Sequence, residues 1–396
     1  MAQRHPHQAS FEGIINVSAS GPLIATQRAR ARRIFYSIVD YFGPPPSDQR
    51  PSEYNRPLLV RYTYEFSRSE LSQDTFLRAF FEFMKWDIAE EDEAKFNINL
   101  ENETMKNELH TNLTLFADFL FDNFFLPLKA SGFHNAQPTP AHLSVIEKAL
   151  GGPQEFIATT DRLSVLRGSC LIRDHNRCVI SRVFDGKEAL TRLRRDGVDA
   201  QDDEGDPLHG QSTMILEVAH IIPHSLTQAN ANAELDDSKK AALLILNMFD
   251  YDVSHVIDGV NIDGPFNAIS LTRDLHTYFG NFEVFFQAVP GRDHTYLIDT
   301  FLPQGFLHYL PVNRSLYLAA DRLIDAPSPR LLAIHCAIAH ILHLSAAGEY
   351  IDHILGDMEE FGVREDGSTG LGYLVKLRFG GWLDRGDRKR TGNWCT

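Results

Sequence analysis

Three polar residues, His220, Asn267 and His276, have the side chains and the spacing for metal-assisted hydrolysis. A neutral imidazole can take a proton from water because its pKa lies near working pH. A divalent cation held by a second imidazole could neutralise charge that grows on a phosphate and its leaving oxygen. An amide at Asn267 could hold a loop or orient the base without titrating. These types of residue therefore indicate one small cleft with a base, a positioning amide and a metal ligand.

The elements around these residues are predicted in the order strand, loop, strand, helix. Pro223 cannot continue a sheet ladder, so His220 is expected at a strand end. Asn267 opens the next short strand, and Thr272 is a candidate N-cap of the helix that carries His276. The predicted elements of this region are helix 162–174, a turn at 175–176, strand 177–181, a solvated loop at 196–210, strand 213–220, helix 239–249, strand 267–271, helix 272–279, and strands 283–289 and 295–299.

Both flanks of this region are predicted to be helical. Helices are expected at 26–42, 74–86 and from about 103, and the second and third are rich in aromatic residues that favour a packed core. Ser328-Pro329 predicts the start of a C-terminal helix. We therefore expect an α+β protein. Its predicted parts are a mostly helical region at 1–154, a mixed domain at 155–300, and a helical region at 301–396 with a short basic tail.

The charge balance and the cysteine count limit the function classes. The 396 residues include 38 Lys and Arg against 53 Asp and Glu, a formal charge of -15, so any nucleic-acid contact needs a local basic patch. Four cysteines without a CxxC pair do not make a disulfide framework, which favours a reducing compartment. No signal peptide and no apolar run of membrane-spanning length is evident. The expected location is intracellular, in the cytoplasm or the nucleus, with no membrane partner.

Two segments around these residues resemble the HNH endonuclease family, specifically its fungal branch. They are Glu217-Val-Ala-His-Ile-Ile-Pro223 and Asn267-Ala-Ile-Ser-Leu-Thr-Arg-Asp-Leu-His276-Thr-Tyr-Phe279, and the stretch from Arg173 to Ser181 looks like the start of the domain. The resemblance implies a ββα-metal module. In that module His220 matches the general base, Asn267 the middle Asn, and His276 a ligand of Mg²⁺ or another divalent cation. The implied partner is nucleic acid.

One position departs from the family pattern. Members often place Asp or His directly before the base as a second metal ligand, and this chain has Ala219 there. The cation would then depend on His276 with Glu217, His224, Asp274 or several waters, which Mg²⁺ accepts.

Three function classes follow from these features. The first is an HNH-type metal-dependent phosphodiester hydrolase, with its activity retained, altered or lost. The second is a metal-independent small-molecule enzyme on the same scaffold, similar to the norbornene-forming Diels–Alder synthases of the sordarin pathway. Such a pericyclase would enclose a hydrophobic substrate in an apolar cavity lined partly by aromatics from Phe76 to Phe125, with no cofactor. The third is a catalytically silent interaction protein. The acidic charge and Ala219 favour the second class, whereas the set His220, Asn267 and His276 favours the first.

Two other polar clusters have simpler explanations. The arginines from Arg28 to Arg33 could contact phosphate, but a solvated helix face explains them equally well. His335, His340 and His343 share one predicted helix, where packing and surface placement explain them better than a metal site does.

Overall fold

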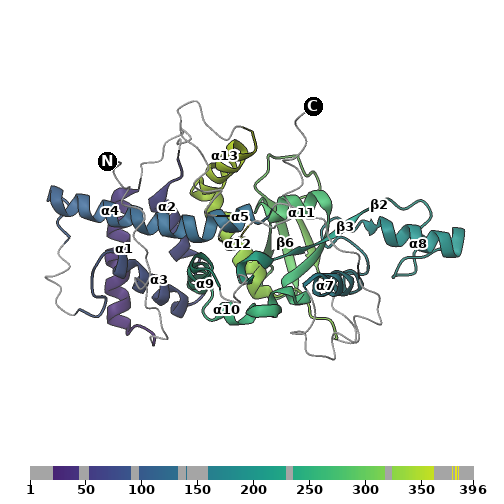
Figure 1. Ribbon diagram of the computed structural model, residues 1–396, viewed down its shortest axis with the longest axis horizontal. Coiled ribbons are helices and arrows are strands. Elements are labelled where there is room, and N and C mark those ends of the chain that lie inside the picture. Colours follow the sequence, from purple (N-terminus) through teal and green to yellow (C-terminus); the bar gives the residue numbers. More distant parts are fainter. Residues whose placement is uncertain are drawn as a thin grey trace, which may run out of the picture.

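The computed structural model describes residues 21–43, 53–90, 98–132, 140, 159–228, 235–316, 323–360, 377, 380 and 382. Helices with small sheets make it an α+β structure, as predicted. Figure 1 shows the first four helices at one end of an elongated molecule and the strands toward the other. The basic tail lies outside the described residues.

The first part of the chain forms long helices whose ends are set by local caps. They are α1 (Ala25–Phe42), α2 (Arg56–Glu65), α3 (Glu70–Phe83) and α4 (Glu103–Leu120), which runs through a π-helical turn, η3 (Phe121–Phe125), into α5 (Leu126–Ala130). Side chains of Asn55, Ser69 and Asn102 accept backbone N–H groups in the first turns of α2, α3 and α4. Helix α2 was not predicted, although Asn55 and Pro57 mark its start.

One arginine of the cluster on α1, Arg28, forms an ion pair that stabilises the fold. Arg28 pairs with the buried carboxylate of Asp74 on α3, with Nε 2.6 Å from Oδ1 and a second hydrogen bond of 2.8 Å to Oδ2. This bidentate pair ties α1 to α3, so Arg28 serves packing and is engaged inside the protein. The aromatic residues around it are core: the side chains of Phe35, Phe76 and Phe80 are fully buried and meet edge-to-face or stacked.

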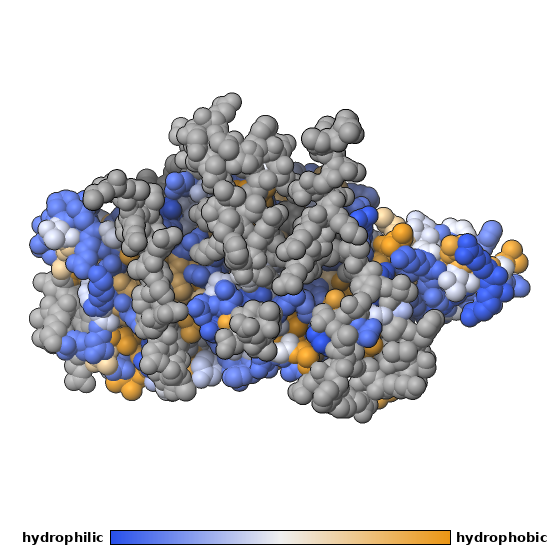
Figure 2. Space-filling view, in the orientation of Figure 1, coloured by the Kyte–Doolittle hydropathy of each residue, from blue (hydrophilic) through white to orange (hydrophobic). Residues whose placement is uncertain are grey.

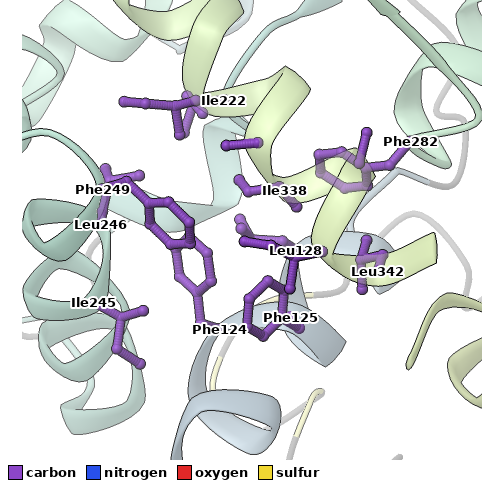
Figure 3. Close-up of a cluster of buried hydrophobic side chains, with 14 of the residues drawn as sticks. Phe124, Phe125, Leu128, Ile222, Ile245, Leu246, Phe249, Phe282, Ile338 and Leu342 are labelled. Atoms are coloured by element: carbon purple, nitrogen blue, oxygen red, sulfur yellow. The ribbon is translucent and has the colours of Figure 1, made fainter. Parts of the chain in front are cut away.

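One hydrophobic core joins the helical end to the region of the predicted site. In Figure 3, Phe124 lies against Phe249, and their ring centroids are 5.5 Å apart. Ile222, from the loop after His220, points toward the same cluster as Ile338. Ile222 is completely buried. The loop that carries His220 is therefore anchored in the main core.

The predicted site lies on a strand pair followed by a helix. Strands β3 (Leu216–His220) and β4 (Ala268–Thr272) pair antiparallel, with Leu216 opposite Thr272 and His220 opposite Ala268. Helix α11 (Arg273–Gly280) follows β4 directly. His220 thus ends a strand, as predicted. Thr272 holds the N-cap position of α11, but its side chain makes no capping hydrogen bond.

Between α7 (Thr159–Arg173) and β3, one predicted strand is absent and one helix was not predicted. Residues 177–181 form a turn instead of a strand, with a single bridge from Arg177 to Phe184. The loop expected at 196–210 is preceded by an unpredicted helix, α8 (Gly186–Asp196), and begins with a 3-10 turn, η5 (Gly197–Asp199). The sequence of α8 is largely polar and did not predict a helix. The helix starts where the side chain of Asp185 accepts the N–H of Glu188. Strand β1 (Phe184–Asp185) precedes it and pairs with β2 (Thr213–Met214).

Helix α8 projects from the body of the protein (Figure 1). It packs on a small separate core of Phe184, Ala189, Ala200 and Leu208. Figure 2 shows hydrophobic surface where this projection joins the body and at its far end. Exposed apolar residues of this part of the chain are Leu190, Val198, Met214 and Ile215.

The rest of the structure surrounds the strand pair. The connection from β3 to β4 contains η6 (His224–Thr227), α9 (Asp237–Phe249), α10 (Val253–Val256), η7 (Gly259–Asp263) and η8 (Pro265–Asn267). A second sheet joins β5 (Val284–Ala288), β6 (Thr295–Thr300) and β7 (Val312–Ser315) antiparallel, and α12 (Pro329–Leu344) packs against β5. Helix α13 (Ala347–Glu360) follows. Ser328 caps α12, as predicted.

The histidines of α12 serve packing. His335 is 1% exposed, stacks on Phe279 with ring centroids 3.9 Å apart, and its Nε2 lies 3.0 Å from the Phe279 carbonyl oxygen. His340 and His343 lie against the ring of Phe301. No single helix among the described residues is long and apolar enough to cross a membrane; α12 and the segment Ala347–Gly356 reach that length and composition only together, across a bend of 82°.

Candidate functional site

A buried carboxylate, Asp263, gathers the polar residues at the end of β3. Its Oδ1 lies 3.2 Å from Nε2 of His220 and 2.7 Å from Nδ1 of His224. Its Oδ2 lies 3.2 Å from Nε of Arg162, which comes from α7. The Asp263 side chain is 0% exposed, whereas the two imidazoles are 17% and 20% exposed. Solvent can therefore reach the imidazoles but not the carboxylate that holds them.

Asn267 fastens the two loops that bring this cluster together. Its Oδ1 accepts the N–H of Ile222, and its Nδ2 donates to the carbonyl oxygens of Ile222 and Ile262, each at 2.9 Å. Ile222 lies between His220 and His224, and Ile262 precedes Asp263. Asn267 is fully buried, so it is a positioning residue that fixes the distance between the imidazoles and the carboxylate.

The electrostatics of the cluster favour a charged Asp263 and a neutral His220. Burial alone would raise the pKa of Asp263, but the hydrogen bonds from His220 and His224 outweigh it and lower that pKa well below its usual range. Burial lowers the pKa of His220 below 6.5, although Asp263 opposes this effect. The positive charges that His224 and His276 can carry lower it further. At neutral pH His220 is therefore a neutral imidazole beside a carboxylate.

A second carboxylate–imidazole pair lies on the same strand. Glu217 of β3 places Oε2 2.9 Å from Nδ1 of His276 on α11. The guanidinium of Arg273, whose side chain is 73% exposed, lies 3.8 Å from Oε1 of Glu217. This region thus presents the oriented imidazole of His276 and the solvent-accessible guanidinium of Arg273 beside the His220 cluster.

An ion pair without solvent contact supports β4 from α7. Arg173 and Asp174 pair at 2.8 Å, and both side chains are 0% exposed. Arg173 also donates to the carbonyl oxygens of Pro265 and Ala268, and Asp174 accepts the N–H of Ser270. The segment Arg173–Ser181, which the family resemblance marked as the start of the domain, therefore holds the strand that follows Asn267 in place.

The structure places the predicted site residues in two groups and adds Asp263 and Arg162 to one of them. His220 and Asn267 belong to the cluster around Asp263, whereas His276 pairs with Glu217. Sequence reasoning missed Asp263 and Arg162, which lie 43 and 58 residues from His220. The only signal for Asp263 was an acid four residues before Asn267, which is too common to select. Arg162 had no signal, because nothing in a helix sequence shows which distant carboxylate it meets.

The resemblance to the HNH family implies a divalent cation, and two sets of donor atoms lie where one could bind. Among the described residues, the His/Cys/Asp/Glu group close enough to share one ion is His220, His224 and Asp263. His276 is outside that group, but its imidazole is held by a carboxylate, as metal-binding histidines commonly are. Ala219 is buried and offers no ligand atom. Glu217 and His276 therefore fit a cation that keeps most of its waters, such as Mg²⁺.

A cavity of about 510 Å³ lies elsewhere. Asp274, one of the candidate ligands, and Tyr278 line this cavity from α11. Each of them lies two residues from His276, so both are on the opposite side of the helix from His276. The expected aromatics from Phe76 to Phe125 do not line this cavity, because they pack in the main core. Its lining also includes Met214, Phe306, Tyr309 and Arg314.

Comparison with known proteins gives one match. The family model described as HNH endonuclease matches residues 178–287, which include both strands of the pair, α11 and Asp263. No curated protein and no solved structure matched the chain.

Proposed function

We propose that the HNH endonuclease-like domain at residues 178–287 is a metal-dependent phosphodiester hydrolase that acts on nucleic acid through His220. The observation that carries this proposal is the contact between Nε2 of His220 and the ionised, buried Asp263. This contact places the hydrogen of the neutral imidazole on Nε2. Nδ1 then keeps its lone pair, and within the described residues it has no protein hydrogen-bond partner.

The residues of the two groups then have separate roles in the reaction. Nδ1 of His220 takes a proton from water while the water oxygen bonds to phosphorus and the bond to the leaving oxygen breaks. Asp263 stabilises the imidazolium that forms, and Asn267 keeps the two at hydrogen-bond distance. A cation bound at His276, which Glu217 orients, would supply a positive charge for the phosphate and the leaving oxygen.

The acidic chain needs a local cation to approach a polyanion. Arg273 is exposed and begins the helix that carries His276, so it is placed to contact a phosphate next to the cation. Arg162 also lies beside the cluster, but its guanidinium binds Asp263. The proposed nucleic-acid contact therefore neutralises few phosphates, and the binding of nucleic acid should weaken only gradually as salt is raised.

The test is plasmid nicking by the full-length protein with Mg²⁺ or Mn²⁺, comparing the wild type with His220→Ala. Loss of a general base should lower the rate by roughly 10²–10⁴-fold. His255→Ala is the matched control, because His255 lies in the connection that follows His220 but is 77% exposed and pairs with Asp252 on the surface. Absence of cleavage of DNA and RNA by the wild type with Mg²⁺, Mn²⁺ or Zn²⁺ would refute the proposal.

The cavity beside α11 supports a second candidate, a metal-independent small-molecule enzyme such as a pericyclase. Its volume of about 510 Å³ lies within the range of ligand sites, and the rings of Tyr278, Phe306 and Tyr309 are part of its lining. Under this candidate, chelators leave the activity unchanged and substitution of Tyr309 lowers it. His220→Ala should then have no effect on turnover, which is the opposite of what the hydrolase proposal expects.

A further inference from the structure

The cluster at the end of β3 has the composition of a transition-metal site. Three donor atoms, one each from His220, His224 and Asp263, all lie within 4.8 Å of one another. The two imidazole nitrogens already lie 3.2 and 2.7 Å from the same carboxylate oxygen. Ligands of a tetrahedral ion with bonds of about 2.0–2.2 Å lie about 3.3–3.6 Å apart, so both nitrogen-to-oxygen separations are within about 1 Å of those around an ion.

The ligands are held in position before any ion arrives. His220 and His224 are separated by Ile221, Ile222 and Pro223, and both isoleucines are buried. Asn267 links this segment to Ile262, next to Asp263. Arg162 holds the other oxygen of Asp263 and leaves Oδ1 for the imidazoles. A pre-formed site loses little conformational freedom on binding, which increases its affinity.

The donor set selects the kind of ion. Two imidazoles and one carboxylate suit Zn²⁺ and its late first-row neighbours, whereas Mg²⁺ and Ca²⁺ take mostly oxygen ligands, including water. Three protein ligands leave a fourth position for water. The imidazoles are partly exposed, so an ion can enter from solvent.

We propose that His220, His224 and Asp263 form a Zn²⁺ site, distinct from the cation position at His276, and that its occupancy inhibits the hydrolase. Binding needs a tautomer change in each imidazole, with the proton of His220 moving from Nε2 to Nδ1 and that of His224 from Nδ1 to Nε2. Nδ1 of His220 then carries a hydrogen and cannot take a proton from water. The inhibition rests on the proposed function, whereas the binding does not.

Zn²⁺ binding is measured on the full-length protein after dialysis against a chelator, by competition with a chromophoric zinc indicator. The expected result is one Zn²⁺ per chain in the wild type. His224→Ala and Asp263→Asn should weaken it by more than the roughly 10–100-fold that loss of an outer-shell partner costs. His255→Ala should bind like the wild type. Co²⁺ added alone should give the visible bands of a four-coordinate ion in the wild type and not in His224→Ala.

Two results would overturn the site: no stoichiometric Zn²⁺ in the wild type, or equal binding by His224→Ala. Circular dichroism checks that each variant is folded, and if Asp263→Asn does not fold, His224→Ala decides. Nicking with Mg²⁺ should stop when one equivalent of Zn²⁺ is added; full activity in the zinc-loaded protein would exclude His220 as a ligand. Zinc binding without nicking under any condition would leave the site standing and refute the proposed function.

Discussion

Two carboxylate–imidazole groups share strand β3, and they differ in burial and in the number of partners. Asp263 has no solvent exposure and contacts two imidazoles and Arg162, whereas Glu217 is 16% exposed and contacts His276 and an exposed arginine. A desolvated carboxylate makes strong interactions, and losing one of its partners has a high cost in free energy. The Asp263 group is therefore suited to fix a base in one tautomer. The Glu217 group, which is open to water, is suited to orient a ligand around a hydrated cation.

The largest effect is expected at the residue that holds the loops of the Asp263 group together. Asn267→Ala leaves the N–H and C=O of Ile222 and the C=O of Ile262 without their partner, at a cost of about 3 kcal/mol in the free energy of unfolding. Urea denaturation measures it. Asn261→Ala is the control, because Asn261 lies in the same connection but is exposed. Equal midpoints for the two variants would show that Asn267 does not hold the loops.

Removing the charge of Asp263 should change the contribution of the Asp263 group to the rate and leave that of the Glu217 group unchanged. Asp263→Asn should lower the nicking rate by about 10²-fold, the low end of the range for base catalysis, because an amide stabilises imidazolium less than a carboxylate does. The Mg²⁺ concentration at half-maximal activity should stay unchanged. Asp258→Asn, an exposed neighbour, serves as the control. If Asp263→Asn changed mainly the Mg²⁺ requirement, the assignment of the two carboxylates would be reversed.

Glu217→Gln should have the opposite signature. Loss of the carboxylate that orients His276 should raise the Mg²⁺ concentration needed for half-maximal nicking by roughly 10–100-fold, with a smaller change at saturating Mg²⁺. A magnesium titration of initial rates measures this shift. Glu188→Gln, which breaks a surface pair with Arg192, is the matched control. An unchanged titration curve would exclude Glu217 from the cation position.

A buried histidine without a carboxylate completes the comparison. Burial lowers the pKa of His335 from 6.5 to about 3, although the Phe279 carbonyl opposes it, so the folded protein keeps His335 neutral while the unfolded chain protonates. Its contribution to stability is complete above pH 6.5 and is lost as pH falls toward 3. The free energy of unfolding should fall by about 1.4 kcal/mol per pH unit between about pH 6 and 4 from this group.

The measurement is urea denaturation at several pH values. His335→Leu should lack this part of the pH dependence, even if its absolute stability differs. His308→Leu, at an exposed position, should keep it. An identical slope in wild type and His335→Leu would mean that His335 is protonated in the folded protein.

The sequence determined the features that depend on neighbouring residues. The helix starts at Ser328-Pro329 and near Glu103 follow from local caps, and the strand that ends at His220 follows from β-rich residues before a proline. Apolar residues at alternating steps of three and four placed Phe116 and Phe124 on the core side of a helix, and both are fully buried. These signals act over a few residues, so a pattern in the chain is enough to reveal them. The same holds for His220, Asn267 and His276, whose order around two strands and a helix could be recognised.

Only the tertiary structure decided which charges meet. Arg28 binds Asp74 across 46 residues, Arg162 binds Asp263 across 101, and His220 binds the same carboxylate across 43. Each acid resembles many others in a chain with 53 of them, and its role depends on burial that comes from packing far away in sequence. Burial makes an unpaired charge costly, so the fold keeps Asp263 beneath two histidines and an arginine. The physical chemistry of the site thus depends on desolvation, which no local pattern encodes.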